Sequence, residues 1–187
     1  MLRKRTPDLT AELIINGFCD RVLRGKAQNR IYPNIYFGPW EADLLEITRA
    51  GYLYEYEIKI SRHDYRKEKS WKGRKYDDLI SGRRVNYFSY IVPEGLVDPE
   101  EIPDWAGLIY ARGYPERVWI GRDKNGGDLF EERTSIRLTT VKDPQKLRSS
   151  KITEEERGII ERKVYFRFHK IRSRLAGHKL ITPFGIT

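Results

Sequence analysis

The stretch from Gly51 to Ser61 carries the side chains of this chain that are best spaced for shared chemistry. Apolar residues alternate with charged ones, which is the pattern of a β-strand with one buried face. Glu55, Glu57 and Lys59 share the charged face, with neighbours about 6–7 Å apart along the strand. The apolar face consists of Tyr54, Tyr56, Ile58 and Ile60. A solvated strand often carries such charges, so this strand alone leaves both a site and an ordinary surface open.

A carboxylate upstream favours a site. Asp43 lies in a second predicted strand, Trp40–Ile47, which a short turn joins to the first. A hairpin of these two strands would place Asp43 beside Glu57. Two carboxylates and a backbone carbonyl, here that of Ile58, are hard oxygen ligands suited to Mg²⁺ or Mn²⁺. Such an ion activates water and neutralises phosphoryl oxygens, while Lys59 would stabilise the negative charge of the transition state.

These residues resemble a nuclease signature. Asp43 followed by Glu57-Ile58-Lys59 is similar to the Asp…(Asp/Glu)-x-Lys motif of the PD-(D/E)XK nuclease superfamily. Ser61–Tyr65 and Tyr87–Pro93 resemble its MmcB-like, DNA-repair-associated branch. Ala42 stands where the family name has proline, which is a mild departure.

The resemblance implies a mixed α/β fold with a restriction-endonuclease-like core, in which helices flank a central mixed sheet and a basic helix follows. We expect a nuclease-like domain over residues 1–150 and a basic helical extension packed on it over residues 151–187. Asp43, Glu57 and Lys59 would be catalytic, and Asp43, Glu57 and the Ile58 carbonyl would hold the metal. In many relatives a first-helix glutamate also reaches the metal. Glu12 is that candidate here, and an ordinary helix-start glutamate is an equal alternative.

The implied function is metal-dependent hydrolysis of phosphodiester bonds in DNA, during repair, recombination or the processing of phage or mobile-element DNA. The alternative from another class is a nuclease-fold module that binds nucleic acid or a protein without cleaving. All three charges of the motif are present, which favours the enzyme. The sequence does not distinguish DNA from RNA, although DNA fits the resemblance better.

The charge distribution supports a polyanionic partner. The net charge of +9 divides into +4 over residues 1–30, zero over residues 31–150 and +5 over residues 151–187. Residues 62–84 add nine Lys and Arg against four Asp and Glu, interleaved with aromatic residues. Such stretches suit phosphate contacts, and simple solubility is the alternative. The candidate nucleic-acid contacts are Arg62, Lys72, Lys75, Arg167, Lys170 and Arg174.

Further elements follow from local patterns. Helices are predicted from Pro7, with Thr6 as its cap, to Arg24, over 64–80 with a break at Gly73, and from Thr153 to Leu175. The last helix should pack through Ile160, Val164, Phe168, Ile171 and Leu175, leaving its basic residues outside.

Further strands are expected at Ile31–Phe37, Asn86–Val92 and Ala106–Ala111. Two more, Arg117–Gly121 and Thr134–Val141, should flank an Asn125-Gly126 hairpin turn.

Several classes are disfavoured. A single cysteine, Cys19, excludes an internal disulfide framework and a Cys-rich zinc site. No apolar run is long enough for a membrane span, so we expect an intracellular, cytoplasmic protein, including a phage protein acting in its host. The oligomeric state is left open.

Overall fold

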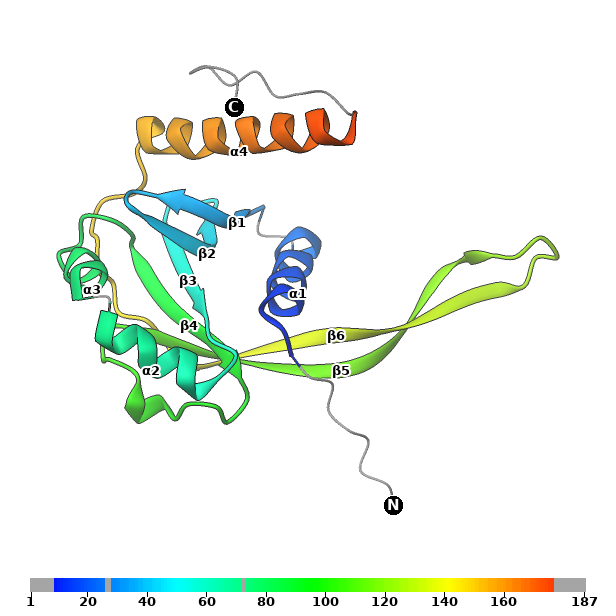
Figure 1. The fold of residues 1–187 in the computed structure, drawn as a ribbon, viewed down its shortest axis with the longest axis horizontal. Coiled ribbons are helices and arrows are strands. Elements are labelled where there is room, and N and C mark those ends of the chain that lie inside the picture. Colours follow the sequence, from blue (N-terminus) through cyan, green and yellow to red (C-terminus); the bar gives the residue numbers. More distant parts are fainter. Residues whose placement is uncertain (1–8, 26–27, 72, 177–187) are drawn as a thin grey trace.

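The computed structural model describes residues 9–25, 28–71 and 73–176. Within these residues, four α-helices flank one six-stranded sheet in the order β1-β2-β3-β4-β5-β6 (Figure 1). The elements are α1 (Ala11–Arg24), β1 (Arg30–Phe37), β2 (Trp40–Ile47), β3 (Leu53–Ile58), α2 (Arg62–Trp71), α3 (Gly73–Ile80), β4 (Tyr87–Pro93), the 3₁₀ turn η1 (Pro99–Glu101), β5 (Gly107–Arg122), β6 (Asp128–Lys142) and α4 (Glu154–Leu175). The predicted fold class, a mixed sheet flanked by helices with a C-terminal helix, is confirmed.

The sheet is mixed because of how its strands are connected. β1, β2 and β3 run antiparallel through short turns. The α2–α3 segment then carries the chain back, so that β4 pairs with β3 in parallel, and β5 pairs with β4 in the same way. β6 returns antiparallel to β5. The crossover predicted after Lys59 is helical in α2 and α3, and Gly73, where a break was predicted, is the first residue of α3.

Two apolar layers cover the two faces of the sheet. On one face, Ile14 and Phe18 of α1 pack against Tyr56 and Ile58 of β3. On the other face, side chains of α2, α3 and the first turns of α4 share one buried cluster, which includes Tyr65, Leu79 and Ile160. The alternation predicted for β3 therefore holds, and its charged side faces α2 and α3 rather than solvent.

α1 begins later than expected. Thr10 caps it, since the Thr10 hydroxyl accepts a hydrogen bond from the Leu13 N–H at 3.2 Å. The predicted start at Pro7 with Thr6 as the cap lies outside the described residues. Both threonines satisfy the local requirement for a cap, so sequence alone did not separate them.

α4 has the predicted N-terminus but not the predicted packing. Thr153 and Glu156 form a capping box. Of the five residues expected to pack, only Ile160 is buried, and the other four are 38–85% exposed. Residues 143–153 are tied to the core by bonds such as Ile152 N–H to the Gly51 carbonyl. The division of the chain at residue 150 stays a prediction.

β5 and β6 are much longer than the predicted strands. The expected strands Ala106–Ala111 and Arg117–Gly121 form one strand, which runs through Pro115. Beyond Ala111, β4 no longer pairs with β5, and an edge strand tolerates proline. The outer halves of β5 and β6 form an arm, residues 113–135, that projects from the rest of the molecule (Figure 1). The turn that includes Asn125 and Gly126 closes it, as predicted.

No helix in the described ranges is long and apolar enough to cross a membrane.

Candidate active site

The predicted β2–β3 hairpin brings Asp43 and Glu57 together. β2 and β3 pair Leu44 with Tyr56, and the same register continued by one residue sets Asp43 opposite Glu57. The Ile58 N–H donates to Asp43 Oδ2 at 2.7 Å. The backbone pairing of β2 and β3 ends at Leu44 and Tyr56. The hydrogen bond from Ile58 therefore holds the Asp43 carboxylate beside the end of β3.

The pKa of Asp43 shows the electrostatic cost of this position. Burial and then the neighbouring Glu57 carboxylate raise the pKa of Asp43 from 3.8 to about 6. The Ile58 hydrogen bond and the ammonium groups of Lys59 and Lys75 act in the opposite direction without cancelling the rise. Two like charges in a partly buried space favour protonation or the binding of a cation.

Glu57 lies between two lysines. Its Oε1 accepts a hydrogen bond from Lys59 Nζ at 2.9 Å, and its Oε2 accepts one from Lys75 Nζ. The side chains of Glu57, Lys59 and Lys75 are 6%, 8% and 0% exposed. The ordinary solvated strand face is therefore excluded, because these charges are buried under α3.

Lys75 also joins Glu57 to a deeper pair that was not predicted from the sequence. Its Nζ lies 3.1 Å from Glu55 Oε1, and Arg84 Nε lies 3.0 Å from Glu55 Oε2. Both contacts have ion-pair distances, but the Glu55 oxygens form no hydrogen bond with these groups. The interaction is therefore electrostatic attraction between opposite charges. Lys75 was a candidate nucleic-acid contact, and the motif order of the resembled family also allowed it to face the site. Its side chain is fully buried and contacts Glu55 and Glu57. The sequence could have indicated the burial of Lys75, because Lys75 and Leu79 are four residues apart on a helix and therefore share one face of α3, which is buried.

The cluster opens to solvent on one side. Asp43 is half-buried, and Asp64, at the start of α2, lies 4.0 Å from Lys59 Nζ with its side chain 48% exposed. Ser61 Oγ accepts from the Asp64 N–H at 3.1 Å and so fixes the first turn of α2. Asp64 was part of the resemblance but not of the predicted site. Its carboxylate stands at the entrance to the buried charges.

The donor set fits a hard divalent cation. Among residues 9–25, 28–71 and 73–176, no three His, Cys, Asp or Glu side chains group as a metal site. Mg²⁺ needs fewer, because it is commonly held by one or two carboxylates with waters and substrate phosphates. Asp43 and Glu57 supply two carboxylates whose mutual repulsion already raises the pKa of Asp43, and Ile58 directly follows Glu57 on the strand. The residues therefore suit the predicted ion in chemical type.

The other predicted residues lie apart from the cluster. Glu12 is exposed in the first turn of α1, on the helix that covers the opposite face of the sheet, and its role as a ligand stays a prediction. Arg62 forms a two-pronged pair with Glu101, at 2.9 and 3.1 Å. Lys170 and Arg174 are exposed on α4, and Lys72 lies outside the described residues.

Arg167 has a structural contact of its own. Its NH1 donates to the carbonyls of Pro33 and Asn34 at 2.8 and 2.9 Å, while Lys163 Nζ donates to the Tyr36 carbonyl at 2.8 Å. These bonds fasten α4 to β1. Arg167 is therefore a poor choice for a variant that tests surface charge alone.

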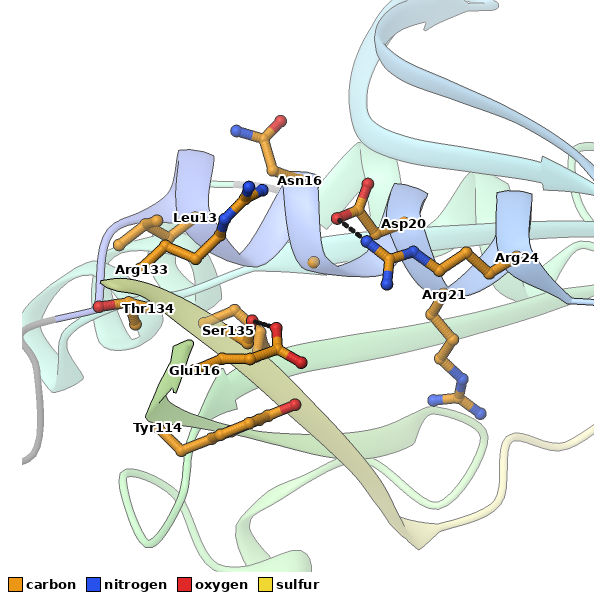
Figure 2. Close-up of a pocket in the computed structure, with 12 residues that line it drawn as sticks. Leu13, Asn16, Asp20, Arg21, Arg24, Tyr114, Glu116, Arg133, Thr134 and Ser135 are labelled. Carbon is orange, nitrogen blue, oxygen red and sulfur yellow. Dashed lines mark hydrogen bonds and ion pairs between the residues drawn. The ribbon is translucent and has the colours of Figure 1, made fainter. Parts of the chain in front are cut away.

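Several cavities lined by the described residues lie outside the charged cluster. Figure 2 shows one of about 300 Å³ between α1 and the root of the arm, where Asp20 pairs with Arg24 at 3.6 Å. Gly17, which helps to line it, allows α1 to approach Ile136 of β6. Another, of about 530 Å³, is a mainly apolar groove between α4 and β1.

Comparison with known proteins adds a fold and no function. No family model and no curated protein matches this chain. Among solved structures, the SPO1766 protein of unknown function from Silicibacter pomeroyi is similar over 94% of this chain and 100% of its own, with a TM-score of 0.55 and 15% sequence identity. At that identity the likeness shows a shared architecture alone.

Proposed function

We propose that this protein is a metal-dependent nuclease that hydrolyses phosphodiester bonds in DNA at the Asp43–Glu57–Lys59 cluster. The observation that carries the proposal is the pairing of Asp43 with Glu57, two carboxylates that crowd one another beside two ammonium groups. A fold gains nothing from such crowding in itself, whereas a cation-binding site requires it.

Each residue has a separate role in the proposal. Asp43 and Glu57, with the Ile58 carbonyl, would hold Mg²⁺ or Mn²⁺. The ion would supply charge neutralisation at the phosphate and a more acidic water. Lys59, beside Glu57, provides a positive charge and hydrogen-bond donor for a pentacovalent, negatively charged transition state. Lys75 neutralises Glu55 and Glu57 from the buried side and so positions Glu57.

Cleavage assays with the full chain test the proposal. Circular and linear DNA, single- and double-stranded, and RNA are incubated with Mg²⁺, Mn²⁺ or EDTA. We expect DNA cleavage with either metal and none with EDTA. Asp43→Asn and Glu57→Gln should each lower the rate by a factor of about 100 or more, because they remove an anionic ligand while keeping its shape. Lys59→Met should do the same with metal binding retained.

The control must be a carboxylate outside the cluster. Glu55 shares the strand face but is fully buried against Lys75 and Arg84, so Glu55→Ala would leave buried cations unpaired and disturb folding. Asp20→Asn on the exposed face of α1 is the better control and should cleave at the wild-type rate. Equal activity in all four variants would reject the proposed site.

One observation favours the alternative of a non-cleaving module. Asp43, Glu55 and Glu57 are matched in number by Lys59, Lys75 and Arg84, so the buried charges balance without a metal. A protein that binds DNA in the assay, leaves it intact with either metal, and gains no thermal stability from Mg²⁺ would be such a module.

A further inference from the structure

The second half of α4 exposes an unusual amount of apolar surface. From Val164 onward the helix leaves the core, and its aromatic side chains are more than half exposed: Tyr165 59%, Phe166 54% and Phe168 60%. The rings of Tyr165 and His169 contact one another at a tilt, with a centroid distance of 4.3 Å and an interplanar angle of 55°. A group of exposed aromatic side chains of this kind is typical of a binding face.

The same segment is uniformly basic. Residues 162–175 contain six Lys and Arg and no Asp or Glu. Lys163 and Arg167 are used to fasten α4 to β1, which leaves four exposed cations on this segment: Arg162, Lys170, Arg172 and Arg174. The face therefore offers planar apolar surfaces and exposed positive charge side by side.

This charge excludes a second α4 as the natural partner. Two such faces brought together would oppose the exposed cations of the two copies, and like charges across an interface are unfavourable. The complementary ligand is an anion that also carries flat apolar groups. A single-stranded nucleic acid has both, because its unpaired bases stack on aromatic side chains while its phosphates meet Lys and Arg. In a duplex the faces of the bases are already stacked and closed to such contact.

A groove runs beside these residues. Phe166 and Phe168 of α4 and Pro33 and Tyr36 of β1 line the apolar cavity of about 530 Å³. The Lys163 and Arg167 bonds to β1 carbonyls hold its two walls together. The groove is thus a fixed feature of the α4–β1 contact rather than a gap between loose segments.

The groove also lies near the candidate active site. Arg167 meets β1 at Pro33 and Asn34, and Pro33 pairs with Leu44, the neighbour of Asp43 on β2. One strand spacing, about 5 Å, separates β1 from β2. Ile160 of α4 belongs to the same buried cluster as Leu45 and Leu79, so α4 packs on the side of the sheet that α3 covers.

We propose that the α4–β1 groove binds single-stranded nucleic acid, with bases stacked on Phe166 and Phe168 and phosphates on Lys170, Arg172 and Arg174. The choice of a nucleic acid rests on the proposed function. The inference goes further in two respects: the substrate is single-stranded, and the α4–β1 groove is the surface that selects it.

Binding in EDTA tests the inference apart from cleavage. Fluorescence anisotropy compares a labelled oligothymidylate with a duplex of equal length. We expect the single strand to bind at least tenfold more tightly. Phe166→Leu and Phe168→Leu keep the apolar character but remove the ring, and each should weaken single-strand binding roughly tenfold. Duplex binding should change little.

Charge and matched controls complete the design. Lys170→Gln with Arg174→Gln should reduce the slope of log affinity against log salt by about 0.7 for each phosphate that the protein no longer neutralises. Trp119→Leu is the matched aromatic control. Trp119 is 54% exposed, but it lies on the arm, where five Asp and Glu exceed four Lys and Arg; single-strand affinity should be unchanged.

The outcomes separate the two proposals. Equal affinity for single strand and duplex, or unchanged binding in both phenylalanine variants, would overturn the inference even if the protein cleaves DNA. A dimer in sedimentation that Phe168→Leu dissociates would assign the face to a second copy and also overturn it. Selective single-strand binding that the variants weaken, without any metal-dependent cleavage, would support the groove and reject the nuclease.

Discussion

Asp43 is the residue at which stability and the proposed chemistry conflict. Its carboxylate takes one good hydrogen bond, from Ile58, yet burial and Glu57 raise its pKa to about 6. In the folded protein Asp43 therefore holds a proton more tightly than in the unfolded chain. Its ionisation destabilises the fold, and the conflict is relieved by a proton or by a cation.

The first prediction concerns the pH dependence of this conflict. Because the folded pKa is the higher one, stability linked to Asp43 is complete below about pH 4 and is lost as the pH rises towards 6 and above. Asp43→Asn, which keeps an oxygen for the Ile58 N–H, should be about 1–3 kcal/mol more stable than wild type at neutral pH. Near pH 4 the two should be equal. Denaturant unfolding in EDTA at both pH values measures this.

Mg²⁺ gives the matched comparison. It should raise the melting temperature of the wild-type protein by binding the folded state and leave that of Asp43→Asn unchanged. Asp20→Asn, on exposed α1, should differ from wild type by no more than about 0.5 kcal/mol at either pH. If Asp43→Asn were less stable than wild type at neutral pH, the charge of Asp43 would stabilise the fold, contrary to this prediction.

At the scale of elements, α1 is held by a close approach to the root of the arm. A Cβ on Gly17 would lie 2.5 Å from the Cβ of Ile136, closer than two carbon atoms can pack. Glycine is needed here because a larger side chain would not fit, and not because of its backbone conformation, which is that of an ordinary helical residue. The contact couples the N-terminal helix to β6, and both residues line the cavity of Figure 2.

Gly17→Ala should therefore destabilise the protein by about 1–3 kcal/mol, because α1 must move away from β6. Gly158 is the matched control, since it lies inside α4 with no atom within 4 Å of an added Cβ. Gly158→Ala should stabilise by roughly 0.5–1 kcal/mol through helix propensity. Thermal unfolding measures both, and stabilisation of equal size in the two variants would contradict the close contact.

At the scale of the whole molecule, the arm stands apart from the core. Its two strands pair with each other outward from Tyr114 and Ser135, and beyond its root the side chains are largely exposed, including Trp119 and Phe130. Its side-chain contacts, such as the cation–π contact between Arg117 and Phe130 at 4.1 Å and the hydrogen bond from Trp119 to Asp128, join the two strands to each other. A two-stranded ribbon of this kind contributes little to global stability.

Excising the arm tests this separation. Replacing residues 117–132 by Asn-Gly joins Glu116 to Arg133, which are partners in the ladder, through a tight turn. The free energy of unfolding should change by less than about 1 kcal/mol, measured by denaturant titration, since the core layers are untouched. A larger decrease, or the disappearance of cooperative unfolding, would show that the arm takes part in the core.

Local sequence determined the parts of this protein that depend on neighbours along the chain. Alternation in β3, the Thr153 cap and the Asn125-Gly126 turn each follow from a few adjacent residues, and the structure has all three. The hairpin that pairs Asp43 with Glu57 was predictable for the same reason, because a short turn sets its register.

Tertiary structure alone decided what covers each face. Strand alternation shows that Glu55, Glu57 and Lys59 share a side, but not that Lys75 and Arg84 bury them. The spacing of Val164, Phe168 and Ile171 predicts an apolar helix face. The structure leaves this face largely exposed, because beyond its first turns α4 is fastened to the edge strand β1 across an open groove. Local patterns encode how a segment is oriented. Burial depends on segments distant in sequence, whose positions follow from the packing of the whole chain.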